Sequence, residues 1–212
     1  LDRSSAASDV YKRQIYFCFV RVAWGLRMDQ FDGGKVFLRK ASESDIPLIS
    51  PWLKTSSCNL DILPGMKNDV AQIIQTSRDG EHTFVIEDTS HTMIGYIFTY
   101  FCDRKNGTFS YYIFIHPTYR RQGAAKESIR MLLNFYFQEL RFQKVTIPIC
   151  VFNKPAATLH DRLEFKLEGR MRRMLYSHGQ FFDLLTYGIT YEEFDTVAID
   201  IEDDSEKVTC DN

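Results

Sequence analysis

The chain has 212 residues, of which 44% are hydrophobic and 25% are charged, and this length is enough for one domain with a sizeable core. The formal net charge of −2 gives no reason to expect a nucleic-acid partner. The five cysteines lie far apart and form neither a CxxC pair nor a Cys/His pair at metal-ligand spacing, so we expect no metal site and a reducing, cytoplasmic compartment.

The first residues are expected to lie outside the native protein. The stretch "SSAASDVYKRQ" (Ser4–Gln14) matches, residue for residue, the translation of a transposon sequencing adapter. The apolar stretch after it is broken by Arg21 and is shorter than the roughly 20 residues that span a bilayer. A signal peptide is the alternative, but no small-residue cleavage site follows. We therefore expect residues 1–27 to be a non-native extension, Met28 to be the native start, and no membrane segment.

From residue 36 onward, predicted strands and helices follow one another. Apolar residues that alternate predict strands, and apolar residues spaced three and four apart predict helices. Strands are expected at 36–41, 82–89, 92–101, 108–117, 144–151, 165–177 and 180–191. Helices are expected at 42–54, 68–79, 123–140 and 154–164.

Several local signals refine this outline. Pro51 is expected to kink or end the first helix, whereas Pro155 fits the first position of the last helix, where a missing N–H costs nothing. The strands at 82–89 and 92–101 are separated by a short polar turn and are expected to pair as an antiparallel hairpin. Cys150 lies in a strand-like stretch, where a buried thiol behaves as a small apolar residue.

One domain is expected over residues 28–195, because neither an internal repeat nor a linker divides them. The end of the chain differs in composition: Glu192–Asn212 contains nine acids and one lysine. We expect residues 196–212 to form an acidic, disordered tail whose role is to solubilise the protein.

The segment His116–Leu133, "HPTYRRQGAAKESIRMLL", joins a predicted strand to a predicted helix. The first N–H groups of a helix are unpaired and carry partial positive charge, so they can bind a phosphate. Gly123 would let the backbone approach an anion, while Ala124 and Ala125 keep side chains away. The residues alone leave two interpretations open, a phosphate site or a tight turn with a basic, solvated rim. The basic residues are Arg120, Arg121 and Lys126.

A longer pattern favours the phosphate site. Arg120, Gly123 and Ala125 form R-x-x-G-x-A, which resembles the acetyl-CoA pyrophosphate loop, Q/R-x-x-G-x-G/A, of the GNAT superfamily of N-acetyltransferases. Downstream, "NKPAATLHDRLEFKLEGRMRR" (153–173) resembles that family's N-x-x-S-x-x-L-Y-x-x-L-G-F-x-x-E-G segment. The closing "GQFFDLLTYGITYEEF" (179–194) resembles the last hairpin of the ribosomal-protein N-terminal acetyltransferase-like (RimJ/RimL-type) branch. The resemblance covers roughly residues 36–195.

The resemblance implies an α/β (α+β) fold, with a mixed, splayed sheet of about seven strands and helices on both faces. Acetyl-CoA would lie in the splay between "YYIFI" (111–115) and "KVTIPIC" (144–150). The backbone N–H near Ile115 would face the thioester carbonyl as an oxyanion donor. The pyrophosphate would rest on the backbone amides of residues 121–125, and Asn153 matches the family asparagine near the pantetheine arm. The cofactor-binding residues so implied are Ile115, Arg120, Arg121, Gln122, Gly123, Ala124, Ala125, Lys126 and Asn153.

The chain departs from the family pattern at four positions. Ala156 replaces the serine, His160 the tyrosine and Glu164 the glycine, and Tyr112 stands where close relatives often have glycine. In the superfamily that serine or tyrosine commonly protonates the departing CoA thiolate. We expect His160 to be the catalytic substitute, because imidazole can protonate the sulfur near neutral pH. The alternative is a half-exposed helix histidine with no role.

Two further patterns concern the acceptor. Tyr96, Tyr100 and Tyr111 could line an acceptor groove, but aromatic residues that alternate along strands more often belong to the core or the sheet surface. The charged run "EGRMRRM" (168–174) is more typical of a solvated strand face than of a substrate site.

Two functions remain open. The first is an enzyme, a monomer or homodimer, that moves acetyl from acetyl-CoA to a primary amine by direct attack. The second is a non-catalytic acyl-CoA-binding protein that keeps the phosphate loop but has lost the acid, which Ala156 favours. For an enzyme, a protein α-amine, a polyamine and a small antibiotic amine all remain as acceptors.

Overall fold

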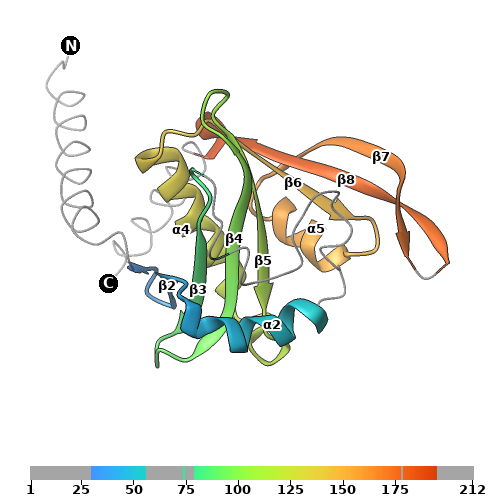
Figure 1. Ribbon diagram of the computed structural model, residues 1–212. Helices are drawn as coiled ribbons and strands as arrows, with labels where there is room; N and C mark the ends of the chain where they lie inside the picture. Colours follow the sequence, from blue (N-terminus) through green and yellow to red (C-terminus); the bar gives the residue numbers. More distant parts are fainter. Residues whose placement is uncertain (1–29, 56–73, 75–78, 178, 195–212) are drawn as a thin grey trace, which may run out of the picture.

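One eight-stranded sheet runs through the described part of the chain, in the order β1-β2-β3-β4-β5-β6-β8-β7 (Figure 1). The computed structural model describes residues 30–55, 74, 79–177 and 179–194. Neighbouring strands are antiparallel except β5 and β6, which are parallel, so the sheet is mixed. The strands are β1 (Gln30–Asp32), β2 (Val36–Lys40), β3 (Thr83–Asp88), β4 (Met93–Asp103), β5 (Thr108–Ile115), β6 (Lys144–Cys150), β7 (Lys166–Ser177) and β8 (Gln180–Thr190).

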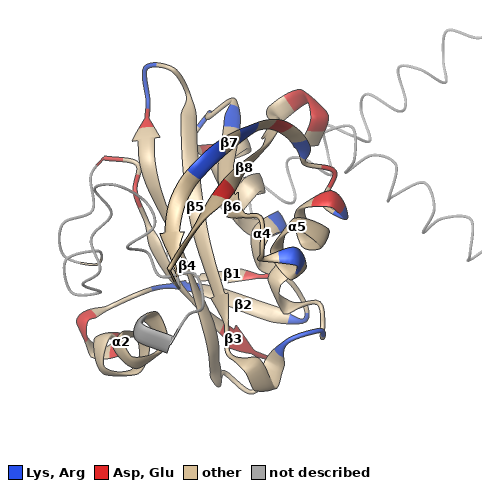
Figure 2. Ribbon diagram, turned by 90° about the vertical axis from the view of Figure 1, so that its right-hand side faces the viewer, with Lys and Arg blue, Asp and Glu red and all other residues tan. Residues whose placement is uncertain are grey.

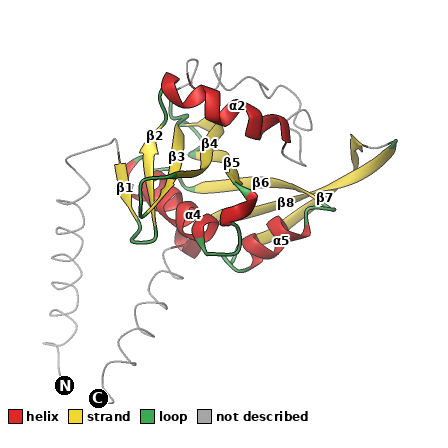
Figure 3. Cartoon of the chain, turned by 90° about the horizontal axis from the view of Figure 1, so that it is seen from below, coloured by secondary structure: helices red, strands yellow, loops and turns green. Residues whose placement is uncertain are grey.

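Helices cover both faces of the sheet (Figure 3). Helix α2 (Ile46–Thr55), which follows a 3-10 turn η1 (Glu43–Asp45), lies on one face. Helices α4 (Ala124–Asn134) and α5 (Lys154–Asp161) lie on the other. The last turns of α4 widen into a π-helical segment, η4 (Phe135–Glu139). The α/β fold with helices on both faces of a mixed sheet is therefore confirmed.

The core divides into two layers because side chains alternate between the faces of a strand. The larger layer packs α4 against the sheet and includes Phe109, Ile129 and Tyr136, all at most 1% exposed. The smaller layer packs α2 against β3, β4 and β5 and includes Ile49, Val85 and Tyr96, also at most 1% exposed. We call the side of the sheet covered by α2 the α2 face.

Strands β5 and β6 separate soon after they meet (Figure 1). Their pairing is confined to Thr108 with Lys144 and Phe109 with Val145. From there β5 continues beside β4 as far as Ile115, while β6 pairs with β8 along its whole length. The backbone of β5 beyond Phe109 therefore faces an opening on its β6 side, which is the splay expected from the resemblance.

The structure alters two expectations and leaves a third untested. The first helix does not end at Pro51 but continues to Thr55. Pro51 withholds a hydrogen bond from the carbonyl of Pro47, and both prolines are exposed, so water can satisfy that carbonyl. The helix predicted at 68–79 lies almost wholly outside the described residues. Of this range the structure describes Ile74, which is helical, and Asp79. Strand β1, with three residues, was too short to give a periodic signal, and it adds an eighth strand to the seven expected.

Strand β7 forms one edge of the sheet, and Figure 2 shows Lys and Arg along it. Its charged residues are exposed and pair with neighbours: Arg170 Nε lies 2.6 Å from Asp183 Oδ2. The interpretation of residues 168–174 as a solvated strand face is confirmed.

Candidate active site

The junction between β5 and α4 forms a cradle of backbone N–H groups. A 3-10 turn, η3 (Pro117–Tyr119), leads into residues 120–123, and α4 begins at Ala124. The N–H of Glu127 donates the first intrahelical bond, to the carbonyl of Gly123 at 3.1 Å. The N–H groups of the three residues before Glu127 precede that bond and remain available at the positive end of the helix dipole.

Gly123 is needed for the shape of this cradle. Its φ is +88°, a left-handed conformation that side chains disfavour, and a Cβ added there would meet nothing within 4 Å. The position is therefore open on the side where an anion would approach. Arg121 also has a positive φ, of +63°. Gln122 lies between them without a positive φ, and a turn that alternates between these conformations can gather backbone N–H groups into an anion-binding concavity.

The side chain of Arg120 turns away from the cradle. Its Nε donates to the carbonyl oxygen of Ile115 at 2.9 Å, and its guanidinium lies 5.7 Å from the ring centroid of Phe114. The N–H of Arg120 donates to the carbonyl of Pro117 at 3.3 Å. Arg120 thus ties the loop to the end of β5, whereas Arg121 and Lys126 remain exposed at the cradle.

The N–H of Ile115 points away from β4 and toward the splay. Along an antiparallel pair, residues that exchange hydrogen bonds with the partner strand alternate with residues that do not. The N–H of His116 donates to the carbonyl of Ile94 at 2.8 Å, so Ile115, opposite Gly95, belongs to the second set. The Ile115 N–H is therefore oriented as an oxyanion donor requires.

Gly95 allows the close strand approach that holds this peptide in place. A Cβ at Gly95 would lie 2.2 Å from the carbonyl oxygen of Phe114. Any larger residue would force β4 and β5 apart next to Ile115. This glycine is one site residue that sequence reasoning missed, and its only sequence signal was a glycine within a predicted strand.

Asn153 and Ala156 belong to the first turn of α5. The Oδ1 of Asn153 accepts from the N–H of Ala156 at 3.3 Å, so this asparagine is the N-cap of the helix. Asn153 lies at the end of β6, on the far side of the splay from β5. Ala156 has no proton to donate.

His160 lies inside the protein and is not half-exposed, since only 3% of it is exposed. Its Nδ1 is 2.8 Å from the carbonyl of Ala156, and its Nε2 is 2.9 Å from the hydroxyl of Tyr111. A carbonyl can only accept, so Nδ1 carries the proton, and Nε2 of the neutral ring accepts from Tyr111. Burial lowers the pKa of His160 below its usual 6.5, although the bond to Ala156 opposes this shift.

The hydrogen bond between Tyr111 and His160 crosses the splay, because it joins β5 to the helix that follows β6. Tyr111 is 2% exposed, and burial raises its pKa well above 10. Tyr96 and Tyr100 lie on the opposite, α2 face and are also buried. The three tyrosines therefore belong to the core and do not line one groove. Tyr111 as a partner of His160 was not foreseen, since 49 residues separate them.

Glu164 takes the place of the family glycine in a left-handed conformation, with φ of +63°. Its N–H donates to the carbonyl of Asp161 and the N–H of Phe165 donates to that of His160, at 3.1 and 3.0 Å. This is the Schellman pattern that ends a helix and that favours glycine at this position. Glu164 therefore has a role in ending α5, and the chain tolerates the strain of a side chain there.

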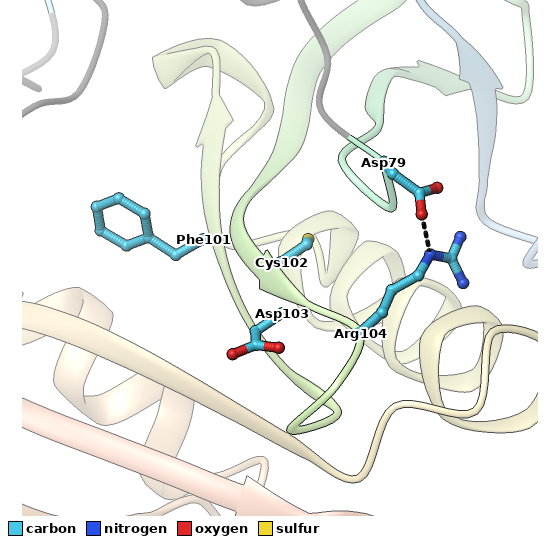
Figure 4. Close-up of a pocket in the computed structure, with 5 residues that line it drawn as sticks. All are labelled: Asp79, Phe101, Cys102, Asp103 and Arg104. Carbon is cyan, nitrogen blue, oxygen red and sulfur yellow. Dashed lines mark ion pairs between the residues drawn. The ribbon is translucent and has the colours of Figure 1, made fainter.

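A surface cavity of about 510 Å³ lies at the other end of β4 and is lined by Asp79, Phe101, Cys102, Asp103 and Arg104 (Figure 4). Asp79 and Arg104 form an ion pair of 2.7 Å across it. Asp103 pairs with Thr108, whereas Gly95 pairs with Ile115 at the opposite end of β5. The cavity is thus remote from the cradle. Burial raises the pKa of Cys102 to about 12, so that thiol is not reactive.

Two further features concern the part of the chain that the structure describes. Its helices include none with the length and apolar character to cross a membrane. Its His, Cys, Asp and Glu side chains include no group of three that could hold a metal ion. Cys150 is buried in β6, as expected.

Comparisons with known proteins agree with this geometry. The model of the acetyltransferase (GNAT) domain family matches residues 35–166. The SPbeta prophage-derived uncharacterized N-acetyltransferase YokL of Bacillus subtilis (strain 168) is 35% identical over 77% of this chain and 94% of its own. The putative ribosomal N-acetyltransferase YdaF of the same organism is 26% identical over 49% of this chain and 57% of its own.

The fold is also that of solved acetyltransferase structures. The crystal structure of spermidine N-acetyltransferase from Vibrio cholerae in complex with CoA and spermine is similar with a TM-score of 0.65 and 21% identity. The similarity covers 76% of this chain and 98% of that one. Because the family model matches more than half of this chain, the chain belongs to the acetyltransferase (GNAT) domain family.

Proposed function

We propose that the protein moves an acetyl group from acetyl-CoA to a primary amine by direct attack. The observation that carries the proposal is the cradle at the start of α4, where Gly123 leaves an open approach to unpaired N–H groups. A pyrophosphate supplies the negative charge that such a site stabilises. The cradle lies at the end of β5, beside the splay, so one extended substrate can occupy both.

In this proposal, the residues of the loop and the splay divide the binding of acetyl-CoA between them. Backbone amides from Arg121 to Ala125 hold the pyrophosphate, and Arg121 and Lys126 add positive charge. Asn153 lies where the pantetheine arm enters the splay. Ile115 donates its N–H to the thioester oxygen, which becomes negatively charged during attack. Arg120 keeps Ile115 in position, because its Nε donates to the carbonyl oxygen of that residue.

We assign protonation of the departing thiolate to His160. Its bond to Tyr111 places the imidazole beside the splay, where the sulfur would lie. Because its pKa is lowered, the imidazolium is scarce at neutral pH, but it is a strong acid once formed. Tyr111 orients the ring.

A second function is supported by Ala156 and His160. Ala156 cannot donate a proton, and both nitrogens of His160 already have partners. These features fit a protein that binds acetyl-CoA without transferring the acetyl group. We place the enzyme first because the cradle and the oxyanion donor are both intact.

Release of free CoA thiol tests the two functions against each other. The full chain is incubated with acetyl-CoA and, separately, with 2-phenylethylamine, spermidine and a peptide with a free α-amine. The enzyme predicts amine-dependent thiol release and an acetylated amine by mass spectrometry. Binding of acetyl-CoA by calorimetry, without thiol release in any arm, would support the non-catalytic protein.

The branch of the family, the cellular location and the assembly are part of the same proposal. The ribosomal-protein N-terminal acetyltransferase-like branch is supported by the partial similarity to YdaF. A cytoplasmic location follows from acetyl-CoA as substrate, and a monomer or homodimer remains the expected assembly.

A further inference from the structure

An aromatic surface lies on the α2 face next to Ile115. Phe114 on β5 and His116, the residue after β5, flank Ile115 and direct their side chains to this face, opposite to that of Ile115. Trp52 of α2 packs on both, with ring centroids 5.7 Å from Phe114 and 5.4 Å from His116. Tyr112, two residues before Phe114, continues the surface and is half-buried.

One polar atom on this face, His116 Nδ1, is buried without a hydrogen-bond partner in the described residues. The hydroxyl of Tyr96, the diagonal neighbour of His116 across β4 and β5, interacts with the side chain of Tyr112. An unsatisfied buried polar group is unfavourable. A ligand that supplies the missing partner explains why His116 is retained at this position.

Among the described residues, the buried carboxylates on the α2 face are already neutralised. The buried acids of the described residues are Asp45 and Glu87, and both are bound by Arg39. Arg39 Nη2 lies 2.7 Å from Asp45, and its Nε lies 2.6 Å from Glu87. Neither carboxylate is left to bind an added ammonium group. This differs from what a substrate with several positive charges requires, because each desolvated charge needs its own counter-charge.

The direction of attack is compatible with the same face. A nucleophile approaches a carbonyl from above or below the carbonyl plane, and the Ile115 N–H lies near the plane of the sheet, so attack from either face of the sheet is possible. On the α4 and α5 side, the larger core and the His160–Tyr111 pair occupy the space beside the splay. On the α2 face, the neighbours of Ile115 include the half-buried His116 and Trp52, so we take this face as the side from which the amine approaches.

We propose that the α2 face beside Trp52 and Phe114 binds a monoamine with an aromatic or apolar body, and that His116 Nδ1 accepts the proton which this amine loses. The inference rests on the proposed acetyl transfer and names its acceptor class and its base. Aromatic rings bind such a body by burial and stacking, and the one amine places its nitrogen at His116.

The step is balanced as follows. The amine nitrogen bonds to the acetyl carbonyl carbon, and the electron pair of the C=O bond moves to the oxygen, which Ile115 N–H stabilises. Before attack, His116 Nδ1 takes one proton from the ammonium form of the amine; after attack, the nitrogen loses a second proton, which matches the one that the thiolate gains. The C=O bond then re-forms, the carbon–sulfur bond breaks, and the CoA thiolate takes up a proton. The products are an N-substituted acetamide and CoA, and His116 returns its proton to water.

The acceptor class is tested on the full-length wild-type protein with 2-phenylethylamine and spermidine. We expect kcat/KM for 2-phenylethylamine to exceed that for spermidine at least about tenfold. Equal values, or a preference for spermidine, would overturn the acceptor class while leaving acetyl transfer itself supported. If neither amine releases CoA thiol although acetyl-CoA binds, the proposed function fails first.

The base is tested with His116→Asn, which keeps a polar group near Nδ1 but cannot accept a proton. We expect kcat for 2-phenylethylamine to fall by a factor of about 10² to 10⁴, with acetyl-CoA affinity unchanged by calorimetry. The loss should be below about tenfold for O-benzylhydroxylamine, which is mostly uncharged at neutral pH and needs no base to become nucleophilic.

A matched variant separates chemistry from packing. His91→Asn makes the same change in an exposed turn, where the side chain is 61% exposed, and should leave kcat for both amines unchanged. Equal losses of rate for the two amines in His116→Asn would mean that His116 only shapes the site. A turnover number within about threefold of wild type would remove it altogether.

Discussion

At the scale of single residues, His160 shows how a family position can acquire a new environment. The imidazole is buried, and each nitrogen has one partner, Tyr111 or Ala156. The ring also packs edge-on against Phe165, with centroids 4.9 Å apart. Its fixed orientation suits an acid that acts at one atom, but it also means that substitution will affect packing.

We predict that His160→Ala lowers the turnover number by a factor of about 10² to 10⁴ and leaves acetyl-CoA binding nearly intact. His160→Tyr should restore part of the rate, because it rebuilds the family arrangement. Steady-state kinetics with a verified acceptor and calorimetric titration of acetyl-CoA measure the two effects.

The control for packing is Phe165→Leu, which disturbs the neighbour of the ring without removing the imidazole. It should lower the melting temperature but change the turnover number little. A turnover number of His160→Ala within about threefold of wild type would show that thiolate departure needs no acid from this residue.

The buried His160 and the half-buried His82 also predict how stability depends on pH. Burial lowers the pKa of His160 and of His82, whose Nδ1 lies 2.9 Å from the hydroxyl of Tyr136, below the usual 6.5. Below about pH 6.5 the unfolded chain binds protons that the folded protein resists, so the free energy of unfolding falls as pH falls. Each unit of pKa difference is worth about 1.4 kcal/mol.

Urea unfolding at pH 7.5 and at pH 5.5 measures this effect, and His82→Gln should reduce the difference between the two. His91→Gln, at an exposed turn, is the control. An unfolding free energy that rises on acidification would contradict the prediction.

At the scale of elements, the loop before α4 depends on its glycine for both shape and access. We predict that Gly123→Val sharply lowers acetyl-CoA affinity, by more than about tenfold, because the side chain enters the space that the pyrophosphate needs. Backbone strain alone could weaken the protein, since φ is +88°. Calorimetric titration of acetyl-CoA measures the affinity.

Gly34→Val supplies the matched control. Gly34 has φ of +79° and, like Gly123, nothing within 4 Å of an added Cβ, but it lies in the turn between β1 and β2. The two variants should lose similar stability, and only Gly123→Val should lose affinity. Equal affinity of wild type and Gly123→Val would place acetyl-CoA elsewhere.

The end of α5 gives a second prediction about an element. Glu164→Gly should raise the free energy of unfolding by about 0.5–1 kcal/mol, because glycine adopts the left-handed conformation without a Cβ clash. Thr158→Gly, at an exposed position inside the same helix, should lower it by about 0.3 kcal/mol. Denaturant midpoints measure both, and a destabilised Glu164→Gly would mean that the carboxylate makes a stabilising contact.

At the scale of the whole molecule, the family match at residues 35–166 and the sheet from β1 to β8 lie within residues 28–195. We predict that a chain starting at Met28 keeps the melting temperature and the acetyl-CoA affinity of the full chain. Differential scanning calorimetry and titration of the two proteins test this. A loss of several degrees would show that residues 1–27 contribute to the fold.

The sequence by itself determined the order of the strands from β2 to β8 and of helices α2, α4 and α5, the cradle loop and the position where α4 begins. These features depend on short-range physics: alternation of apolar residues, the conformational freedom of Gly123, and the preference of Pro155 for a first helical turn. The sequence also predicted where β5 and β6 separate, because the family resemblance covers that region.

Only the tertiary structure decided how distant side chains meet. Strand order brings Tyr111 to His160, turns Arg120 onto Ile115, and buries His116 Nδ1 against α2 without a partner. Local periodicity assigns a residue to a face, but it cannot tell which element covers that face or whether a buried polar atom finds a partner there. Those contacts depend on how β4, β5, α2 and α5 pack together, and in this protein they complete the candidate active site around the cradle loop.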